Sequence, residues 1–436
     1  MSGEQTPTSK TMEEAIRCFE SGNHDRAAAL CREILAARPS EVPANSMLGI
    51  IHASRGELDE AETYLLKARN VAPDNPGTCI NLAQLFLERG RLDEAREAFR
   101  RGYELIGRSH GNMAVYHNST FEPEKANAGE AYVHRITDAL VDTAYWSVMK
   151  GDRVYTIETG NRNIANSPFV AGRMSADNKV AAIDPPDPVT EIAEPCILLG
   201  GDENYAHWHV RYLMRLALLE DRPDLQNLRL LVNEDLRPYQ RESLSLLGYG
   251  HESLIPVPRE ATVRCRELYV PTCLRIDAPR IAFGARWLQR RILEAACPLP
   301  AGPSARIYVS RRDAACRFLE NEDEVMAALA PLGFASVELG RLSFREQVGM
   351  FANAEIVVAP HGAGLANLIY ASETCGFVEL VSDPIAHMGD FRAIARGLGL
   401  NMEVLPCSSY RMIPDAQHNF ITAPDTVVAA VAKVAG

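Results

Sequence analysis

The sequence predicts an α-helical repeat region at the N-terminus followed by an open α/β region. Glycines recur near the N-terminus at a spacing of 34, at Gly22, Gly56 and Gly90. From about residue 194 short apolar runs alternate with amphipathic stretches, which is the pattern of strands separated by helices. The 436 residues are 47% hydrophobic and 23% charged, so most of the chain is expected to pack into ordinary cores.

Other residues of the N-terminal repeat keep the same register. Ala27, Ala61 and Ala95 are also spaced by 34. In a two-helix repeat, glycine supplies the turn between the helices and alanine lets them approach closely. The period and residue types resemble the tetratricopeptide repeat and predict about three helix pairs within residues 10–107. Two roles remain open: a concave surface that binds a protein partner or builds a homo-oligomer, and a spacer.

The rest of the chain is expected to divide into three parts. Residues 108–193 have poor periodicity and a proline-rich break at 185–188, which predicts a linker and the entry to the next domain. Two Rossmann-like halves then follow, over 194–300 and 301–436, with a seam near residues 298–303. The expected strands are 196–199, 228–232, 264–270, 307–310, 335–338, 355–359, 377–380 and 402–405. Ligands of open α/β sheets bind at the carboxyl ends of strands, so chemistry is expected there.

Charge and composition limit the classes of partner. Lys+Arg 45 against Asp+Glu 57 leaves a net charge of −12, which argues against broad binding of nucleic acid. No stretch reaches the roughly 18 apolar residues that span a bilayer, and residues 1–10 lack the apolar core of a signal peptide. A cytoplasmic location is therefore expected. The ten cysteines form no Cys-x-x-Cys pair and no Asp-x-Asp occurs, so no metal site is expected.

The sharpest motif is a glycine turn after the strand at 355–359. The candidate residues of this motif and of the next strand are His361, Gly362, Ala363, Gly364, Asn367 and Glu379. Glycines let backbone N–H groups approach a ligand, and a helix N-terminus adds partial positive charge, a combination that suits a diphosphate. Glu379 could accept hydrogen bonds from ribose hydroxyls. The alternative is a tight strand–helix turn with Glu379 in a surface ion pair and His361 in a supporting role.

Arginines follow the strand at 307–310. Arg311 is expected to face the same crevice as the glycine turn, and Arg317 lies six residues further on. Guanidinium is planar, always charged and bidentate, so these groups could neutralise a diphosphate. For any single arginine here, a plain ion pair with Asp313 or Glu322 is the competing interpretation.

A third cluster follows the strand at 196–199 and consists of Asp202, Glu203, Asn204, His207 and Trp208. Apolar residues at helical spacing predict a buried helix that begins near Asn204. Asn204 and His207 would share one face at the start of that helix. Either His207 or a neighbouring carboxylate could take a proton from a hydroxyl group. A structural histidine is the alternative, and Trp208 could simply belong to the core.

Taken in order, these fragments resemble glycosyltransferase family 61. The resemblance covers about 185 residues, from 196 to 380. The matching fragments are 204–208, 239–248, 267–271, 308–311, 317–322, 342–347, 361–367 and 378–380. It implies a GT-B fold that joins two Rossmann-like halves and an inverting, metal-independent transfer from a nucleotide sugar, expected to be a UDP-sugar, to a hydroxyl acceptor.

The resemblance also implies roles for particular residues. The C-terminal half would hold the donor, through Arg311, Arg317, His361, Gly362, Ala363, Gly364, Asn367 and Glu379. The N-terminal half would offer the acceptor, a glycan or protein, near Asn204 and Trp208. The base would be His207, Asp202 or Glu203, and no cofactor is implied. The repeats would hold a protein partner.

The chain departs from the family pattern at two positions. Many bacterial members have Asp four residues after the His of the first motif, where this chain has Arg211, and Met214 stands where Pro is usual. One alternative is therefore a non-enzymatic repeat scaffold that carries a degenerate nucleotide-sugar-binding domain. A second is a nicotinamide-dependent oxidoreductase, against which Asn367 argues, because the dinucleotide fingerprint has Gly or Ala there.

Overall fold

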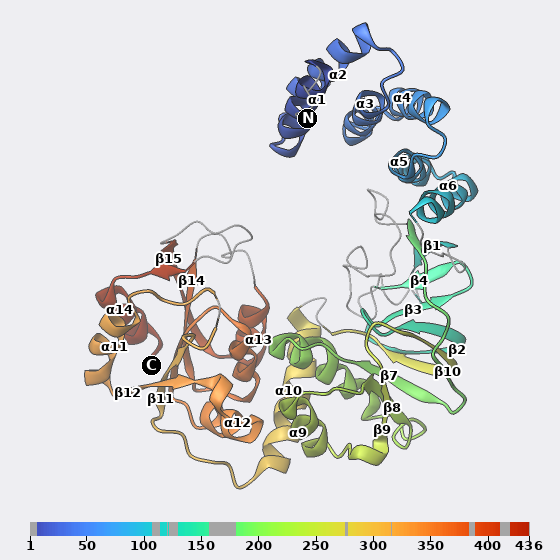
Figure 1. Cartoon of the computed structure of the whole chain (residues 1–436). Helices are drawn as coiled ribbons and strands as arrows, with labels where there is room; N and C mark the ends of the chain where they lie inside the picture. The colour runs from blue at the N-terminus through green and yellow to red at the C-terminus, as the bar shows by residue number, and fades with distance from the viewer. Residues whose placement is uncertain are drawn as a thin grey trace, which may run out of the picture.

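The computed structural model describes residues 7–106, 114–119, 121, 130–156, 180–274, 278–314, 316–382, 389–409 and 419–435. Figure 1 shows an arc of helices at the N-terminal end, next to a sheet that contains β7, β8 and β9, and a second α/β unit beyond α10. The predicted order, a helical repeat region followed by an α/β region, is confirmed.

The arc consists of three antiparallel helix pairs. The helices are α1 (Pro7–Glu20), α2 (His24–Ala37), α3 (Val42–Ser54), α4 (Leu58–Val71), α5 (Pro76–Glu88) and α6 (Leu92–Leu105). The three repeat glycines lie in the turns within the pairs, with φ between 70° and 78°, a region that side chains strain to enter. Ala27, Ala61 and Ala95 are fully buried where paired helices touch. The residue types that repeat every 34 positions are therefore those that the hairpin geometry requires.

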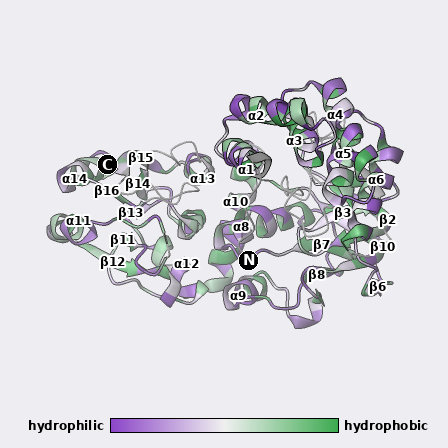
Figure 2. Cartoon of the chain, turned by 45° about the horizontal axis from the view of Figure 1, so that its top comes forward, coloured by the Kyte–Doolittle hydropathy of each residue, from purple (hydrophilic) through white to green (hydrophobic). Residues whose placement is uncertain are grey.

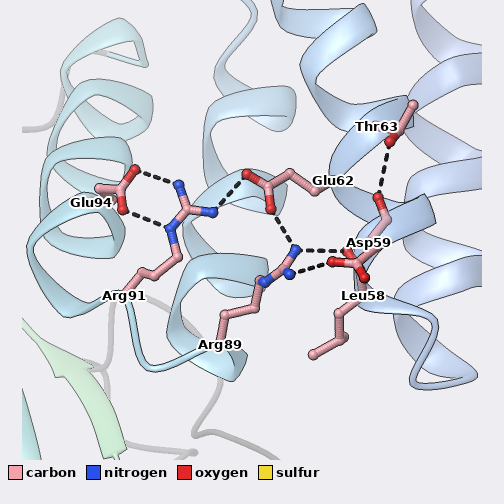
Figure 3. A network of polar contacts seen from close by, with 7 residues as sticks. All are labelled: Leu58, Asp59, Glu62, Thr63, Arg89, Arg91 and Glu94. Atoms are coloured by element: carbon pink, nitrogen blue, oxygen red, sulfur yellow. Dashed lines mark hydrogen bonds and ion pairs between the residues drawn. The ribbon is translucent and has the colours of Figure 1, made fainter.

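Ion pairs connect the turn of one repeat with the next. Glu62 on α4 lies between two arginines: its carboxylate oxygens are 2.5 Å from Arg89 Nη1 and 2.7 Å from Arg91 Nη1 (Figure 3). Arg89 also pairs with Asp59, as Arg55 pairs with Asp25 one repeat earlier. The Asp59 and Asp25 carboxylates are largely exposed and such pairs stabilise weakly, so apolar packing between the helices is expected to contribute most of the stability of the stack.

The last repeat packs against the neighbouring sheet. Phe99 of α6 is fully buried in one cluster with Ala182 of β5 (Val180–Ile183), and α6 contacts β1 (Ala114–Ser119). A repeat stack exposes an apolar surface at each end unless something covers it. Here the sheet covers the C-terminal end, which joins the repeats to the α/β region.

The first sheet is mixed. Its strand order is β5-β1-β4-β3-β2-β10-β7-β8-β9, with β6 beside β10. The further strands are β2 (Val133–Asp142), β3 (Ser147–Lys150), β4 (Arg153–Tyr155), β6 (Thr190–Ile192), β7 (Cys196–Gly200), β8 (Arg229–Asn233), β9 (Leu254–Val257) and β10 (Thr262–Pro271). β10, β7, β8 and β9 pair in parallel, whereas β2 is antiparallel to β10.

Residues 108–193, predicted as a linker and entry segment, contribute strands β1 to β6 to this sheet. The described part of that segment is therefore sheet structure and not only a connection. Its strands are short or antiparallel, and buried and exposed positions do not alternate regularly along β2. Periodicity in the sequence therefore did not reveal them.

The helical elements of the first unit lie between its strands. They are α8 (Tyr205–His207), the π-helical turn η2 (Trp208–Tyr212), the 3₁₀ segment η3 (Leu213–Leu219), α9 (Pro238–Leu246) and the 3₁₀ turn η4 (His251–Ser253). The helix predicted to begin near Asn204 does begin there, because the Asn204 side chain accepts hydrogen bonds from the amides of Ala206 and His207.

The second sheet is parallel except at one edge. Its order is β12-β11-β13-β14-β15-β16, where only β16 is antiparallel to its neighbour. The strands are β11 (Arg306–Ser310), β12 (Phe334–Glu338), β13 (Ile356–Pro360), β14 (Gly376–Ser382), β15 (Asn401–Ser409) and β16 (Phe420–Ile421). The helical elements are α11 (Glu322–Leu329), η5 (Ala330–Leu332), η6 (Leu339–Arg341), α12 (Phe344–Ala352), η7 (Ala363–Tyr370), α13 (Asp390–Leu398) and α14 (Pro424–Val434).

The helix α10 (Ala278–Ala296) lies between the two units. It packs against α9 and η3 on one side and against α12, α13 and η7 on the other (Figure 2). One apolar cluster runs continuously from the first sheet to the second. Among the described residues no helix combines the length and hydropathy needed to cross a bilayer.

The side chains at the starts of α12 and α11 make different contacts. Ser343 and Glu346 form a complete capping box at the start of α12. Asn321 precedes α11 but its side chain does not cap it. Instead its side-chain amide donates to the Thr422 carbonyl and accepts from the Thr422 N–H. Thr422 directly follows β16, so these bonds connect the start of α11 to the end of that strand.

Candidate functional site

A cavity of about 460 Å³ lies where the two α/β units meet. The first unit contributes Tyr205, Pro238, Tyr239 and Glu242, from α8 and α9. The second contributes Val309, Ser310, Arg311, Asp313, Leu339, Gly340, Leu342, Ser343, Phe344, Gln347 and Gly364. Most of these residues follow the carboxyl ends of strands β11, β12 and β13, which is where open α/β sheets bind ligands. A cavity of this size and position is typical of a small-molecule site.

Arg311 is the cation on the wall of this cavity. Its Nε and Nη2 each donate a hydrogen bond, at 3.2 Å, to the backbone carbonyls of Arg317 and Cys316. Within the part of the chain that the structure describes, no carboxylate pairs with it. Burial, together with the nearby charge of Arg317, lowers the pKa of Arg311. Two backbone carbonyls thus hold the guanidinium in place, and no described carboxylate forms an ion pair with it, an arrangement that suits an anion site.

Arg317 stands beside it in a strained conformation. Its φ is 60°, a left-handed value that is uncommon outside glycine. Its Nε is buried and has no hydrogen-bond partner among the described residues. Unlike Arg312, which pairs with Glu322 and Asp323, it makes no ion pair in that part of the chain. Two neighbouring cations without carboxylates point to a multiply charged anion as their ligand.

The glycine turn brings its backbone directly under Arg311. A Cβ placed on Gly362 would lie 1.8 Å from Arg311 Nη1, and a Cβ on Gly364 would lie 2.6 Å from Leu339 Cδ1. Gly362 has φ −177°, so no unusual backbone angle requires glycine there. Glycine is required at 362 because the Arg311 guanidinium occupies the space that a Cβ would need. The predicted meeting of Arg311 with the glycine turn is found in the structure, and Ala363 begins the 3₁₀ segment η7 beside it.

His361 and Glu379 are joined behind the turn. His361 Nδ1 is 2.6 Å from Glu379 Oε1, and the other carboxylate oxygen accepts a bond of 2.7 Å from Arg392 Nε. Glu379 is 0% exposed and both its oxygens are engaged. It therefore cannot reach ribose hydroxyls in this geometry. The sequence prediction of a donor-binding carboxylate is corrected to a buried group that holds His361.

The second dyad lies in the first unit, after β7. His207 Nδ1 is 2.9 Å from Asp202 Oδ2, and both side chains are about one-third exposed, at 33% and 30%. Burial would raise the pKa of Asp202, but the hydrogen bonds from His207 and the Asn204 amide lower it further, with a net decrease. Asp202 is thus an ionised acceptor that orients the His207 ring, an arrangement suited to proton abstraction.

The dyad adjoins the cavity but does not line it. Helix α9 holds the dyad's loop, because Gln240 Nε2 donates to the Asp202 carbonyl and Tyr239 Oη donates to the Glu203 carbonyl. Tyr239 itself lines the cavity. No group of three or more metal-ligating side chains is found in the described ranges.

Comparison with known proteins decides the identity of this region. The family model described as Glycosyltransferase 61 matches residues 205–378, which include both the first-unit helices and the glycine turn. The chain carries a glycosyltransferase 61 domain. A Tetratricopeptide repeat model matches residues 42–108. The enzyme class predicted from the sequence, a glycosyltransferase, and the repeat architecture are thereby confirmed.

Three similar solved structures each cover less than a third of this chain. The chaperone SycD of Yersinia enterocolitica is 17% identical, with a TM-score of 0.23, over 29% of this chain and 86% of that one. The protein pilF of Pseudomonas aeruginosa is 20% identical, with a TM-score of 0.22, over 22% of this chain and 44% of that one. The Sgt2 repeat domain of Aspergillus fumigatus is 20% identical, with a TM-score of 0.23, over 25% and 72% of the two chains. No curated protein matches the chain.

Three of the predicted site residues are engaged by other residues of the protein. Trp208 is fully buried and donates to Ser243 Oγ, so it belongs to the core. Asn367 is also fully buried, accepts from Tyr205 Oη at 2.7 Å and donates to Gln347, so it links the two units instead of contacting a donor. Glu203 is half exposed and pairs with Arg237 and Arg259, so it is not the carboxylate that contacts His207.

Sequence reasoning missed three further residues around the site. Tyr205 lines the cavity and reaches across to the second unit. Glu242 of α9 accepts the first amides of α12, at 3.0 Å from Phe344 N, and so fixes one unit against the other. Arg392 holds Glu379. The Tyr205 position fell inside a recognised motif, but nothing in the local sequence distinguishes Glu242 or Arg392 from surface charges.

Gly362→Ala is expected to abolish most nucleotide binding while leaving the protein folded. The added methyl would overlap the Arg311 guanidinium, so Arg311 must leave the turn. We expect the Kd for UDP to rise by about tenfold or more, measured by calorimetry. Gly389→Ala is the matched control, because no atom of the described residues lies within 4 Å of its Cβ position. Equal affinities in the two variants would contradict the assigned contact.

Proposed function

We propose that this chain transfers a sugar from a nucleotide sugar, a UDP-sugar in the first instance, to a hydroxyl acceptor. The donor would bind in the cavity between the two α/β units, in a GT-B arrangement. One observation carries this proposal: Arg311 lines that cavity without a carboxylate partner among the described residues and lies against the backbone of Gly362. The glycosyltransferase 61 match over the same residues supports it.

The chemistry follows from where charge develops. As the bond between the anomeric carbon of the donor sugar and its diphosphate oxygen breaks, negative charge accumulates on the departing diphosphate. Arg311, Arg317 and the backbone amides of the glycine turn would stabilise that charge, and such preorganised donors commonly contribute several kcal/mol. In this proposal the guanidinium groups supply the positive charge, so transfer is expected to proceed without an added divalent cation.

The base would be the Asp202–His207 dyad. With Nδ1 held by Asp202 at 2.9 Å, His207 can accept a proton at Nε2 from the acceptor hydroxyl. The hydroxyl would then attack the anomeric carbon from the side opposite the diphosphate, which inverts its configuration. The tetratricopeptide repeats would dock a protein partner or the acceptor itself.

A nucleotide-sugar screen on the full chain tests this function. UDP-, GDP- and CMP-sugars should be compared by thermal shift, since a ligand that binds only the folded protein raises the melting temperature. Release of UDP with and without candidate acceptors then measures turnover, with and without a metal chelator. A UDP-sugar shift together with chelator-resistant UDP release is the expected result. No shift with any nucleotide sugar would refute the proposal.

A non-enzymatic scaffold remains the second candidate because of Arg211. This residue lies one helical turn after His207, and its charge acts on Asp202. Binding of UDP-sugars without hydrolysis or transfer, across a broad acceptor panel, would favour the scaffold.

A further inference from the structure

The buried trio of His361, Glu379 and Arg392 carries an inference beyond the binding site itself. β13 and β14 are parallel neighbours, and Ala359 pairs with Glu379 in their register. His361 lies two residues beyond Ala359, so its side chain falls on the same face as Glu379. Helix α13 covers this face, with Phe391 against the His361 ring at 5.1 Å between centroids and Arg392 against Glu379.

The hydrogen bonds of the trio have one consistent assignment. Arg392 can only donate, so Glu379 Oε2 accepts from its Nε at 2.7 Å. As a carboxylate, Glu379 has no proton to give, so Oε1 must accept from His361 Nδ1 at 2.6 Å. The proton of a neutral His361 ring is then on Nδ1, and Nε2 carries the lone pair.

We propose that Arg392 is a positioning residue, which acts through Glu379 to fix the orientation and the Nδ1-protonated tautomer of His361 beside the glycine turn. Without Arg392, the fully buried Glu379 carboxylate would keep only His361 as a partner among the described residues, and its second oxygen would lose the hydrogen bond that it accepts there. A carboxylate free to rotate, or to take up a proton, no longer imposes one tautomer on the ring. The effect on nucleotide binding rests on the proposed function, whereas the tautomer does not.

The tautomer can be observed directly. In the full chain with ¹⁵N-labelled histidine, two-bond NMR correlations distinguish Nδ1–H from Nε2–H rings, and His361→Asn identifies the signal. The wild-type ring is expected to carry its proton on Nδ1. In Glu379→Gln the amide oxygen faces Arg392 and the amide NH₂ faces the ring, so the proton is expected to move to Nε2. In Arg392→Gln both tautomers are expected.

Binding of UDP supplies the second measurement. Arg392→Gln is expected to raise the Kd by about tenfold, and Arg392→Lys, which keeps the charge, should recover part of the loss. Arg396→Gln, an exposed position one turn along α13, is the matched control and should change the Kd by less than about twofold. Circular dichroism confirms that each variant is folded.

The outcomes separate this inference from the proposed function. Changed tautomers with no UDP binding by any variant, wild type included, would uphold the positioning role and remove the donor site. An Nδ1–H ring in wild type, Glu379→Gln and Arg392→Gln alike would overturn the positioning role. Should Arg392→Gln fail to fold, the Glu379→Gln tautomer decides alone.

Discussion

Replacing Arg311 by alanine is expected to weaken UDP binding by about 10- to 100-fold. Hydrogen bonds to charged groups contribute about 1.5–3 kcal/mol each. The Nε and Nη2 of Arg311 bond to backbone carbonyls, whereas Nη1 faces the glycine turn and has no hydrogen-bond partner among the described residues. Isothermal titration of UDP into the full chain measures the effect. The loss should be larger for UDP than for uridine, because the contact is with the diphosphate.

Arg341 supplies the control for this variant. It adjoins the same cavity, between the lining residues Gly340 and Leu342, but its side chain is 79% exposed and paired with Glu338. Arg341→Ala removes the same formal charge and should leave the Kd within about threefold. A similar loss of UDP affinity in both variants would contradict the assigned contact. It would mean that the net positive charge near the cavity attracts UDP and that the position of Arg311 does not matter.

Asp202→Asn is expected to slow sugar transfer by about 10²- to 10⁴-fold with little change in the Kd for UDP. A positioned base contributes a factor of that order, and an amide at 202 can donate to His207 Nδ1 and so reverse the ring's tautomer. Turnover is measured as acceptor-dependent UDP release. Glu203→Gln, in the same loop but paired with Arg237, should retain transfer. Loss of transfer in Glu203→Gln alone would assign the base to Glu203.

The lowered pKa of Asp202 gives this variant a stability signature as well. A carboxyl whose pKa is lower in the folded state stabilises the protein above its unfolded pKa, and this contribution fades as the pH falls through the folded value. Asp202→Asn lacks that contribution. The difference in melting temperature between wild type and variant should therefore shrink from pH 7 toward pH 3.

Much of the architecture could be predicted because its elements repeat local rules. Gly22, Gly56 and Gly90 occupy turns that require positive φ, so the repeat follows from their spacing alone. The parallel strands are continuous apolar runs, which stand out against amphipathic helices. The strands β1 to β6, β9 and β16 were not foreseen, since short strands and antiparallel pairs such as β2 with β3 depend on a partner that no local pattern reveals.

In the candidate site, too, local features could be predicted from the sequence, whereas contacts between distant segments could not. Residues at strand ends, such as Arg311 and His361, were found because sequence order places them at one edge of the sheet. Whether a side chain binds a ligand or another residue depends on what arrives from elsewhere in the chain. Glu379 was misassigned because Arg392 comes from a helix that follows β14, and Asn367 because Tyr205 comes from the other unit.

A crystal structure of the full chain with UDP tests the central claim most directly. The diphosphate is expected within hydrogen-bond distance of Arg311 Nη1 and the amides of Gly362–Gly364, in the cavity between the units. UDP bound elsewhere, for example in the separate cavity of about 330 Å³ beside β9 and α9, with Arg311 untouched, would contradict it.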